Sequence, residues 1–189
     1  MLTFRDKYKS NVYSQNGEDG IIQEVMKRLD IPKGVCVEFG ATDGYYCSNT
    51  RNLIDSQWEG YMYDIDPGST AIQKAEITPE NVNDIIPAEC DLLSIDIDGN
   101  DFEVWRAYKG SAKVVIIEIN SDYLPDERIF DKGTSYLPML LLGIAKGYFL
   151  LCHTGNLIFI ENKYKELFPE ITGNPITDFK DYFDYSWVH

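Results

Sequence analysis

Acidic side chains lie at the ends of several short apolar segments of this sequence. Such segments cover residues 35–39, 61–65, 92–97 and 114–119. If they are parallel strands, their carboxyl ends meet at one edge of a sheet, where folds of this kind bind ligands. Because an unpaired buried carboxylate is energetically costly, we expect a cationic ligand or a metal ion among these acids, which are Glu38, Asp64, Asp96, Asp98 and Glu118.

A glycine-bearing turn follows the first apolar segment. Gly40 and Gly44 carry no Cβ, so the backbone can turn sharply there and come close to a ligand. A dinucleotide-binding turn has the pattern G-x-G-x-x-G, which cradles a pyrophosphate. Here Glu38 precedes the two glycines, and Thr42 lies where a middle glycine would stand. The turn therefore predicts a nucleotide cofactor without phosphates.

The later carboxylates have more than one interpretation. Asp64 lies 24 positions after Gly40, close to the interval of about 20 at which a carboxylate binds ribose hydroxyls. Either Asp98 or Glu118 can serve as a general base. Acid clusters also occur for purely structural reasons, but an oxygen-rich group of this kind suits a hard divalent cation such as Mg²⁺. Its candidate ligands are Asp96, Asp98, Glu118 and Asn120.

Alternating strands and helices should position these residues. Strands are expected at 35–39, 61–65, 92–97, 114–119, 148–152 and 157–160, with a short third strand and a weak helix within 69–78. Helices are expected after Asn16, from Ser48 or Asn49, from Pro79, from Asn100 and over 135–146, with capping boxes at 16–19 and 100–103. This order, which ends in an antiparallel hairpin, indicates an α/β fold with a doubly wound sheet and one reversed strand.

Composition narrows the range of partners. The 189 residues carry a formal charge of -14, from 31 acidic and 17 basic side chains, so nucleic acids and anionic membranes are not expected to bind. The sequence has no apolar stretch of about 18 residues and no signal-peptide core, which predicts a cytoplasmic protein. The four cysteines show no C-x-x-C pairing and are expected to be free thiols.

Several stretches together resemble the FkbM-like branch of the class I S-adenosylmethionine-dependent methyltransferases. The glycine turn alone is a weak indication, but the ordered set is fairly specific and covers most of residues 13–160. The matching stretches are Ser14-Gln15-Asn16-Gly17-Glu18-Asp19-Gly20, Val37-Glu38-Phe39-Gly40-Ala41-Thr42-Asp43-Gly44 with Ser48-Asn49-Thr50, Leu92-Leu93-Ser94-Ile95-Asp96-Ile97-Asp98-Gly99-Asn100-Asp101, and Lys146-Gly147-Tyr148.

The resemblance implies a seven-stranded Rossmann-like sheet and methyl transfer to the oxygen of a small-molecule or sugar hydroxyl. It implies one methyltransferase domain over 1–189, with a helical leader (1–33), a core (34–160) and a tail (161–189). Asp64 would hold the ribose, and Asp96 would face the sulfonium. The implied cofactor-binding residues are Glu38, Gly40, Ala41, Gly44, Asn49, Asp64 and Asp96.

Other functions stay open at this point. A relative without activity would bind S-adenosylmethionine as a subunit or scaffold. A nicotinamide-dependent oxidoreductase would need a phosphate-cradling glycine that the turn lacks. The sequence leaves undecided the acceptor, the need for a divalent cation, the formation of a homo-oligomer and the role of residues 161–189.

Overall fold

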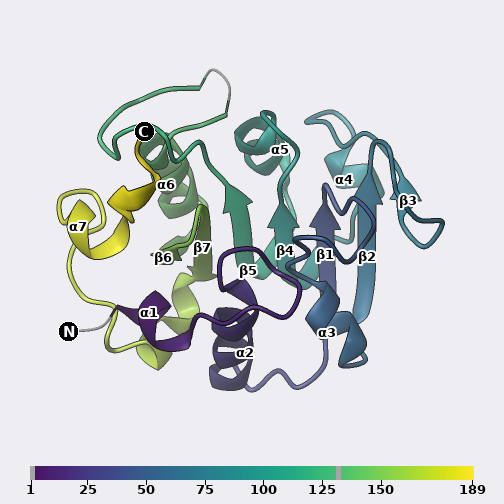
Figure 1. Cartoon of the computed structure of the whole chain (residues 1–189), viewed down its shortest axis with the longest axis horizontal. Helices are drawn as coiled ribbons and strands as arrows, with labels where there is room; N and C mark the ends of the chain where they lie inside the picture. Colours follow the sequence, from purple (N-terminus) through teal and green to yellow (C-terminus); the bar gives the residue numbers. More distant parts are fainter. Residues whose placement is uncertain (1–2, 131–132) are drawn as a thin grey trace.

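A computed structural model describes residues 3–130 and 133–189 (Figure 1). The chain forms a seven-stranded sheet with helices on both faces. The strands are β1 (Val35–Phe39), β2 (Glu59–Asp64), β3 (Gln73–Lys74), β4 (Glu89–Ile95), β5 (Ser111–Glu118), β6 (Tyr148–His153) and β7 (Asn156–Glu161). The α-helices are α1 (Phe4–Tyr8), α2 (Glu18–Arg28), α3 (Arg51–Asp55), α4 (Val82–Ile85), α5 (Asp101–Ala107), α6 (Tyr136–Ala145) and α7 (Phe179–Tyr182), and the 3₁₀ helices are η1 (Asn162–Leu167) and η2 (Tyr185–Trp187).

The strands lie in the order β3-β2-β1-β4-β5-β7-β6. The pairs from β3 to β5 are parallel, whereas β7 is antiparallel to both of its neighbours. The chain leaves β1 toward β2 on one side and β4 toward β5 on the other, so the strand order reverses between β1 and β4. The expected seven-stranded α/β sheet with a C-terminal antiparallel hairpin is confirmed, and its strand order is compatible with a Rossmann-like fold.

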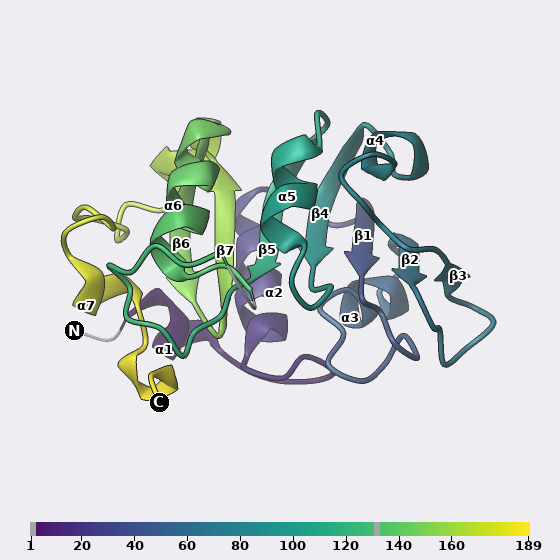
Figure 2. The same cartoon turned by 90° about the horizontal axis from the view of Figure 1, so that it is seen from above.

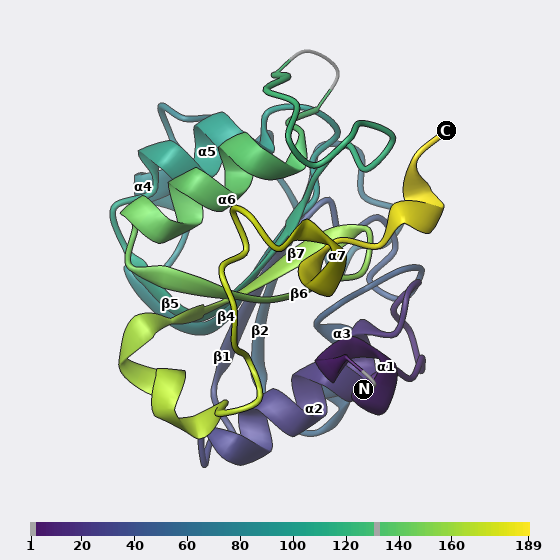
Figure 3. The ribbon, with the colours of Figure 1, turned by 90° about the vertical axis from the view of Figure 1, so that its left-hand side faces the viewer.

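Each face of the sheet has its own apolar core, which lies beneath the helices that cover that face (Figures 2 and 3). Helices α4, α5 and α6 cover one face, where Trp105 packs edge to face against Tyr148 and tilted against Phe159. Helices α1, α2 and α3 cover the other face, where Ile21 and Val25 belong to the same buried cluster as strand residues of β4 and β5. Since both faces are covered, the central strands are apolar on both sides, as in parallel sheets generally.

Both predicted capping boxes are wrong. Helix α2 begins after Gly17, which has φ +102°, and the Asp19 carboxylate accepts hydrogen bonds from the backbone N–H groups of Val12, Tyr13 and Ser14. At the second box, Asn100 makes no side-chain cap; instead, Asp101 accepts from two preceding backbone N–H groups. In both places the carboxylate stabilises the loop before the helix and does not cap the helix itself.

Three other expectations need correction. No helix forms within 69–78, and the helix expected from Pro79 begins at Val82. The helix expected from Ser48 or Asn49 begins at Arg51, because residues 48–50 bind a buried carboxylate described below. The sequence pattern predicts no helix or strand at 121–134, between the expected strand 114–119 and the expected helix 135–146, and this stretch includes residues 131–132, which lie outside the described residues.

All four cysteines are free thiols, as predicted, and three of them are buried. Across the described part of the chain, no helix is both long enough and apolar enough to cross a bilayer.

Candidate functional site

Two adjoining cavities open at the carboxyl edge of the sheet. We call them cavity A, about 410 Å³, and cavity B, about 590 Å³; both lie within the range of small-molecule sites. Cavity A lies over the ends of β1, β2 and β4, and cavity B lies over the end of β5 and the turn between β6 and β7. Asp96 and Asp98 line both cavities, so the two spaces meet at these acids.

Glu38 joins the end of β1 to the loop before α3. Its carboxylate is 4% exposed. It accepts hydrogen bonds from the Ser48 hydroxyl (2.6 Å), the Asn49 backbone N–H (2.7 Å) and the Thr50 hydroxyl (2.7 Å). Burial raises the pKa of Glu38, and these three donors oppose the rise. Glu38 lines cavity A as expected, but most of its bonding capacity holds the loop 48–50 in place.

Asn49 extends this connection to β4. Its side-chain Nδ2 donates to the Ser94 hydroxyl at 3.0 Å, and Asn49 also lines cavity A. The Ser48-Asn49-Thr50 stretch is therefore chemically matched to a buried acid on the neighbouring strand. The Ser48-Asn49-Thr50 stretch could be recognised in the sequence, but the sequence did not show that its donors bind Glu38.

Gly40 lets two strand ends approach each other. It has φ +72°, and a Cβ at this position would lie 1.7 Å from the Asp96 carbonyl oxygen. Only glycine fits such a contact. Gly40 also lines cavity A, so the same residue closes the gap between β1 and β4 and shapes the floor of the cavity.

Asp64 lines cavity A at the end of β2. Its two oxygens accept backbone hydrogen bonds from Thr42 and Asp66, each at 2.8 Å. Each oxygen keeps a lone pair that a ligand hydroxyl can use. The carboxylate is thus held in a fixed position on the cavity wall, and it also holds the glycine turn.

Two predicted cofactor residues do not line cavity A. Ala41 is buried in a small apolar cluster with Met62 and Ile72. Gly44 has φ +82°, and its backbone N–H donates to the Ala41 carbonyl. Both residues belong to the turn and stabilise it, Ala41 by apolar packing and Gly44 by this backbone hydrogen bond. Tyr46, which lies in the same loop, does line the cavity.

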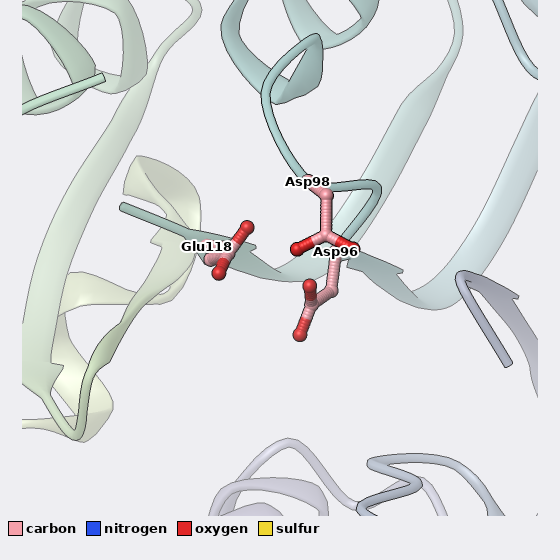
Figure 4. A group of neighbouring side chains, drawn as sticks. All are labelled: Asp96, Asp98 and Glu118. Atoms are coloured by element: carbon pink, nitrogen blue, oxygen red, sulfur yellow. The ribbon is translucent and has the colours of Figure 1, made fainter. Parts of the chain in front are cut away.

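Asp96, Asp98 and Glu118 converge where the cavities meet (Figure 4). Each offers a carboxylate oxygen, and these oxygens lie within 4.8 Å of one another. Strand β4 ends at Ile95, so the alternation of side chains along a strand does not bring Asp96 and Asp98 to one side. Instead, Asp98 has φ +56° and lies in a turn that places its side chain beside Asp96. Three oxygen donors this close together suit a hard divalent cation.

The proximity of these acids changes their proton affinity. Loss of hydration and the nearby charges of Asp101 and Asp98 raise the pKa of Asp96 to about 6. Loss of hydration and the charge of Asp96 raise the pKa of Glu118 to about 8. The neighbouring acids therefore favour the protonated form of Glu118, and any positive charge placed beside it favours release of that proton.

Asn120, the fourth candidate cation ligand, lies further along cavity B. Its side-chain oxygen accepts the backbone N–H of Asp122 at 3.1 Å. It therefore shapes the loop after β5 and contributes an amide to the cavity wall.

A loop before α2 supplies another wall of cavity B, through Gln15 and Asn16. Glu18, which is 1% exposed, accepts the Asn16 backbone N–H (2.8 Å) and the Thr154 hydroxyl (2.7 Å). The loop is thereby fixed to the turn between β6 and β7. In the sequence, helix capping was the favoured interpretation of this motif, and contact with a substrate was the less favoured one.

The lining of the two cavities has a clear electrostatic character. Among the described residues that line them there is no lysine, arginine or histidine, whereas cavity A contains Glu38, Asp64, Glu76, Asp96 and Asp98, and cavity B adds Glu118 and Asp122. Cavity A also has apolar walls from Phe39, Ile65 and Ile77. A phosphate-free cation with an apolar portion fits this set of side chains, whereas a pyrophosphate does not.

No protein-family model matches the sequence, and no curated protein matches it. The resemblance to FkbM-like methyltransferases therefore stays a hypothesis that depends on the residues named above.

Proposed function

We propose that this protein is an S-adenosylmethionine-dependent methyltransferase of the FkbM-like type, which acts in the cytoplasm on a hydroxyl oxygen. The main support is the position of cavity A. It lies at the carboxyl edge of the sheet beside the strand-order reversal, where such folds bind nucleotides, and acids rather than basic side chains line it. That lining suits a sulfonium cofactor.

The cofactor-binding residues have separate tasks in this proposal. Asp64 accepts hydrogen bonds from the ribose hydroxyls, and Asp96 places negative charge beside the sulfonium. Asn49 and Gly40 shape the wall at the methionine end. When bound, the cofactor supplies an electrophilic methyl group. Fixed placement of donor and acceptor is the main contribution that a protein makes to an in-line displacement of this kind.

The acceptor occupies cavity B. The bond from sulfur to the methyl carbon breaks as the bond to the acceptor oxygen forms, and the hydroxyl proton passes to a carboxylate. Asp98 and Glu118 are the two candidate bases, since both line cavity B. The positive charge of the cofactor lowers the proton affinity of Glu118, so this residue becomes available as a base when the site is filled.

The walls of cavity B suit a polar acceptor. Gln15, Asn16 and Asn156 provide amides, Trp187 provides an indole, and Asp122 adds a carboxylate. Amides and carboxylates bind hydroxyl groups, and an aromatic face packs against an apolar one. A sugar or another hydroxylated small molecule meets these conditions, whereas an anionic acceptor would be repelled.

A divalent cation is compatible with the same site. Asp96, Asp98 and Glu118 would hold it, and it would lower the pKa of the acceptor hydroxyl.

Calorimetric titration with S-adenosylmethionine and its demethylated product, with and without Mg²⁺, tests the proposal. Asp64→Ala should weaken donor binding by about 1–3 kcal/mol, because hydrogen bonds to the ribose are lost. Asp66→Ala is the matched control, since this neighbouring acid is 94% exposed and does not line cavity A. Equal affinities in wild type and Asp64→Ala would refute the ribose assignment.

A transfer assay separates an enzyme from a protein that only binds the cofactor. Labelled donor is incubated with a panel of monosaccharides, methyl glycosides and simple secondary alcohols, and label in the products is counted. Donor binding without transfer to any member would favour a non-catalytic subunit. Binding of NADH with no donor binding would favour the oxidoreductase instead.

A further inference from the structure

The C-terminal segment reaches cavity B through Trp187. This residue follows α7 in the 3₁₀ helix η2 and lines the cavity. The indole lies against the turn between β6 and β7, since a Cβ on Gly155 would lie 3.1 Å from two of its ring atoms. Residues 183–187, here called the C-terminal strap, thus contribute Trp187 to the wall of cavity B.

His153 connects the strap to the sheet. The imidazole is fully buried at the end of β6. Its Nδ1 accepts the backbone N–H of Asp184 at 3.1 Å, and its Nε2 lies 2.8 Å from the Ser121 hydroxyl. The ring also stacks on Phe183, with centroids 4.5 Å apart and planes at 6°.

The hydrogen bonds determine the tautomer. Because Nδ1 accepts a hydrogen bond, the proton of the neutral ring lies on Nε2, which donates to Ser121. The Ser121 hydroxyl in turn donates to the Gly155 carbonyl at 3.0 Å. One imidazole therefore links three segments of the cavity wall: the loop after β5, the β6–β7 turn and the strap.

Asp184 adds a second link at the base of the strap. Its carboxylate accepts the Arg5 guanidinium at 2.6 Å and the Ser186 backbone N–H at 3.1 Å. The first bond ties the strap to α1, and the second begins η2, which carries Trp187. The contacts of His153 and Asp184 thus hold the start of the strap in place, three residues before Trp187.

We propose that His153 is a positioning residue, and that through the strap it holds Trp187 in place as a determinant of acceptor binding. The part that concerns the acceptor rests on the proposed function; the positioning of Trp187 does not. The proposal gives the segment after residue 161 a function that the sequence left open.

Acrylamide quenching of tryptophan fluorescence tests the positioning. Trp58 and Trp105 are buried, so the quenchable signal comes from half-buried Trp187, as Trp187→Phe will verify by removing it. His153→Phe keeps an aromatic ring against Phe183 but removes both polar links. We expect it to raise the quenching constant at least about twofold, because the strap loses its attachment. An unchanged constant would overturn the proposal.

Two further variants make this result specific. Ser121→Ala removes the link to the turn while the imidazole stays, and it should raise quenching by a smaller amount; it also serves if His153→Phe fails to fold. Tyr148→Phe is the matched control, because it removes a buried hydroxyl that is bonded to Ala112 at the start of β5, away from cavity B. Its quenching should equal that of the wild type.

Kinetics test the second part of the proposal. With the hydroxyl compound that accepts label in the transfer assay, His153→Phe and Trp187→Ala should each raise the acceptor KM about tenfold, equivalent to about 1.4 kcal/mol. The donor affinity should stay unchanged. Unaltered KM in both variants would refute the role in acceptor binding. If wild type binds no donor, the proposed function fails, whereas the quenching result still decides the positioning.

Discussion

At the scale of single residues, the site depends on a few positions that allow no substitute. Gly40 is one, because the Asp96 carbonyl oxygen occupies the space of its missing Cβ. The sequence indicated a need for glycine here, but it gave a different reason, since a ligand and not a neighbouring strand was expected at close range. What the sequence could not provide was the register between β1 and β4 that creates this contact.

Gly40→Ala should destabilise the protein by about 3 kcal/mol or more, since a backbone atom cannot move aside as a side chain can. Gly147→Ala is the control. It also has positive φ, +90°, but a Cβ there meets nothing within 4 Å, so only the backbone strain of about 1–2 kcal/mol applies. Urea unfolding of both variants measures the difference. Equal losses would mean that strain alone explains the glycine.

The raised pKa of Glu118 makes stability depend on pH. A carboxyl whose folded pKa lies above its unfolded value keeps its full contribution below about pH 4.5, and the contribution is lost as the pH rises toward 8. Glu118→Gln should therefore be more stable than wild type by about 1–3 kcal/mol at pH 8 and nearly equal near pH 4. Urea unfolding at several pH values checks this.

A control separates charge from shape in that comparison. Glu103→Gln alters an acid on α5 that pairs with Arg106 at the surface, so it should show no such rise with pH. If the Glu118→Gln difference were constant across the pH range, the charge explanation would fail.

At the scale of elements, hydrophobic patterns predicted the presence and order of the strands and helices far better than the residues at which the helices begin. Strands β1, β5, β6 and β7 lie within a few residues of their predicted places, because period-two and continuous apolar runs follow burial directly. The start of α3 was missed because Glu38 binds the residues before it, and the cap of α2 was assigned wrongly because Asp19 binds preceding backbone groups. A sequence shows that an acid is available but not which donor it reaches.

The link between Glu18 and Thr154 can be measured with a double-mutant cycle. Glu18→Ala should cost about 2–3 kcal/mol of stability and Thr154→Val about 1–2 kcal/mol, since each leaves a buried partner unsatisfied. The double variant should cost at least about 1 kcal/mol less than the sum.

A second cycle provides the reference for that coupling. Glu24 lies on the same helix as Glu18 but pairs with Arg28, so Glu24→Ala and Thr154→Val should be additive. Additivity in both cycles would show that the link carries no coupling energy.

At the scale of the whole molecule, negative charge is the dominant property. With a formal charge of -14 and no basic side chain among the described residues that line cavity A, the protein attracts cations at long range. In the sequence, the net charge argued only against anionic partners, and the acids at the strand ends predicted a cationic ligand. The sequence did not show that the C-terminal strap would contribute to the wall of cavity B. The contacts of His153 join residues 31 and 32 positions apart, and no periodic pattern marks such contacts.

Salt should therefore weaken binding of S-adenosylmethionine more than binding of the demethylated product, which lacks the sulfonium charge. Between about 20 mM and 500 mM NaCl, we expect the Kd of the donor to rise about 3- to 10-fold and that of the product less than about twofold. Calorimetry at several salt concentrations measures both. Parallel salt curves for the two molecules would argue against electrostatic recognition of the sulfonium.

Asp96 and Asp98 line both cavities. A molecule bound in one cavity therefore lies against side chains that also face the other cavity. Whatever factor the first molecule applies to the affinity of the second, the second must apply to the first. Under the proposed function, binding of the donor and binding of the acceptor would therefore be coupled through Asp96 and Asp98. A substitution at either one will change both affinities together.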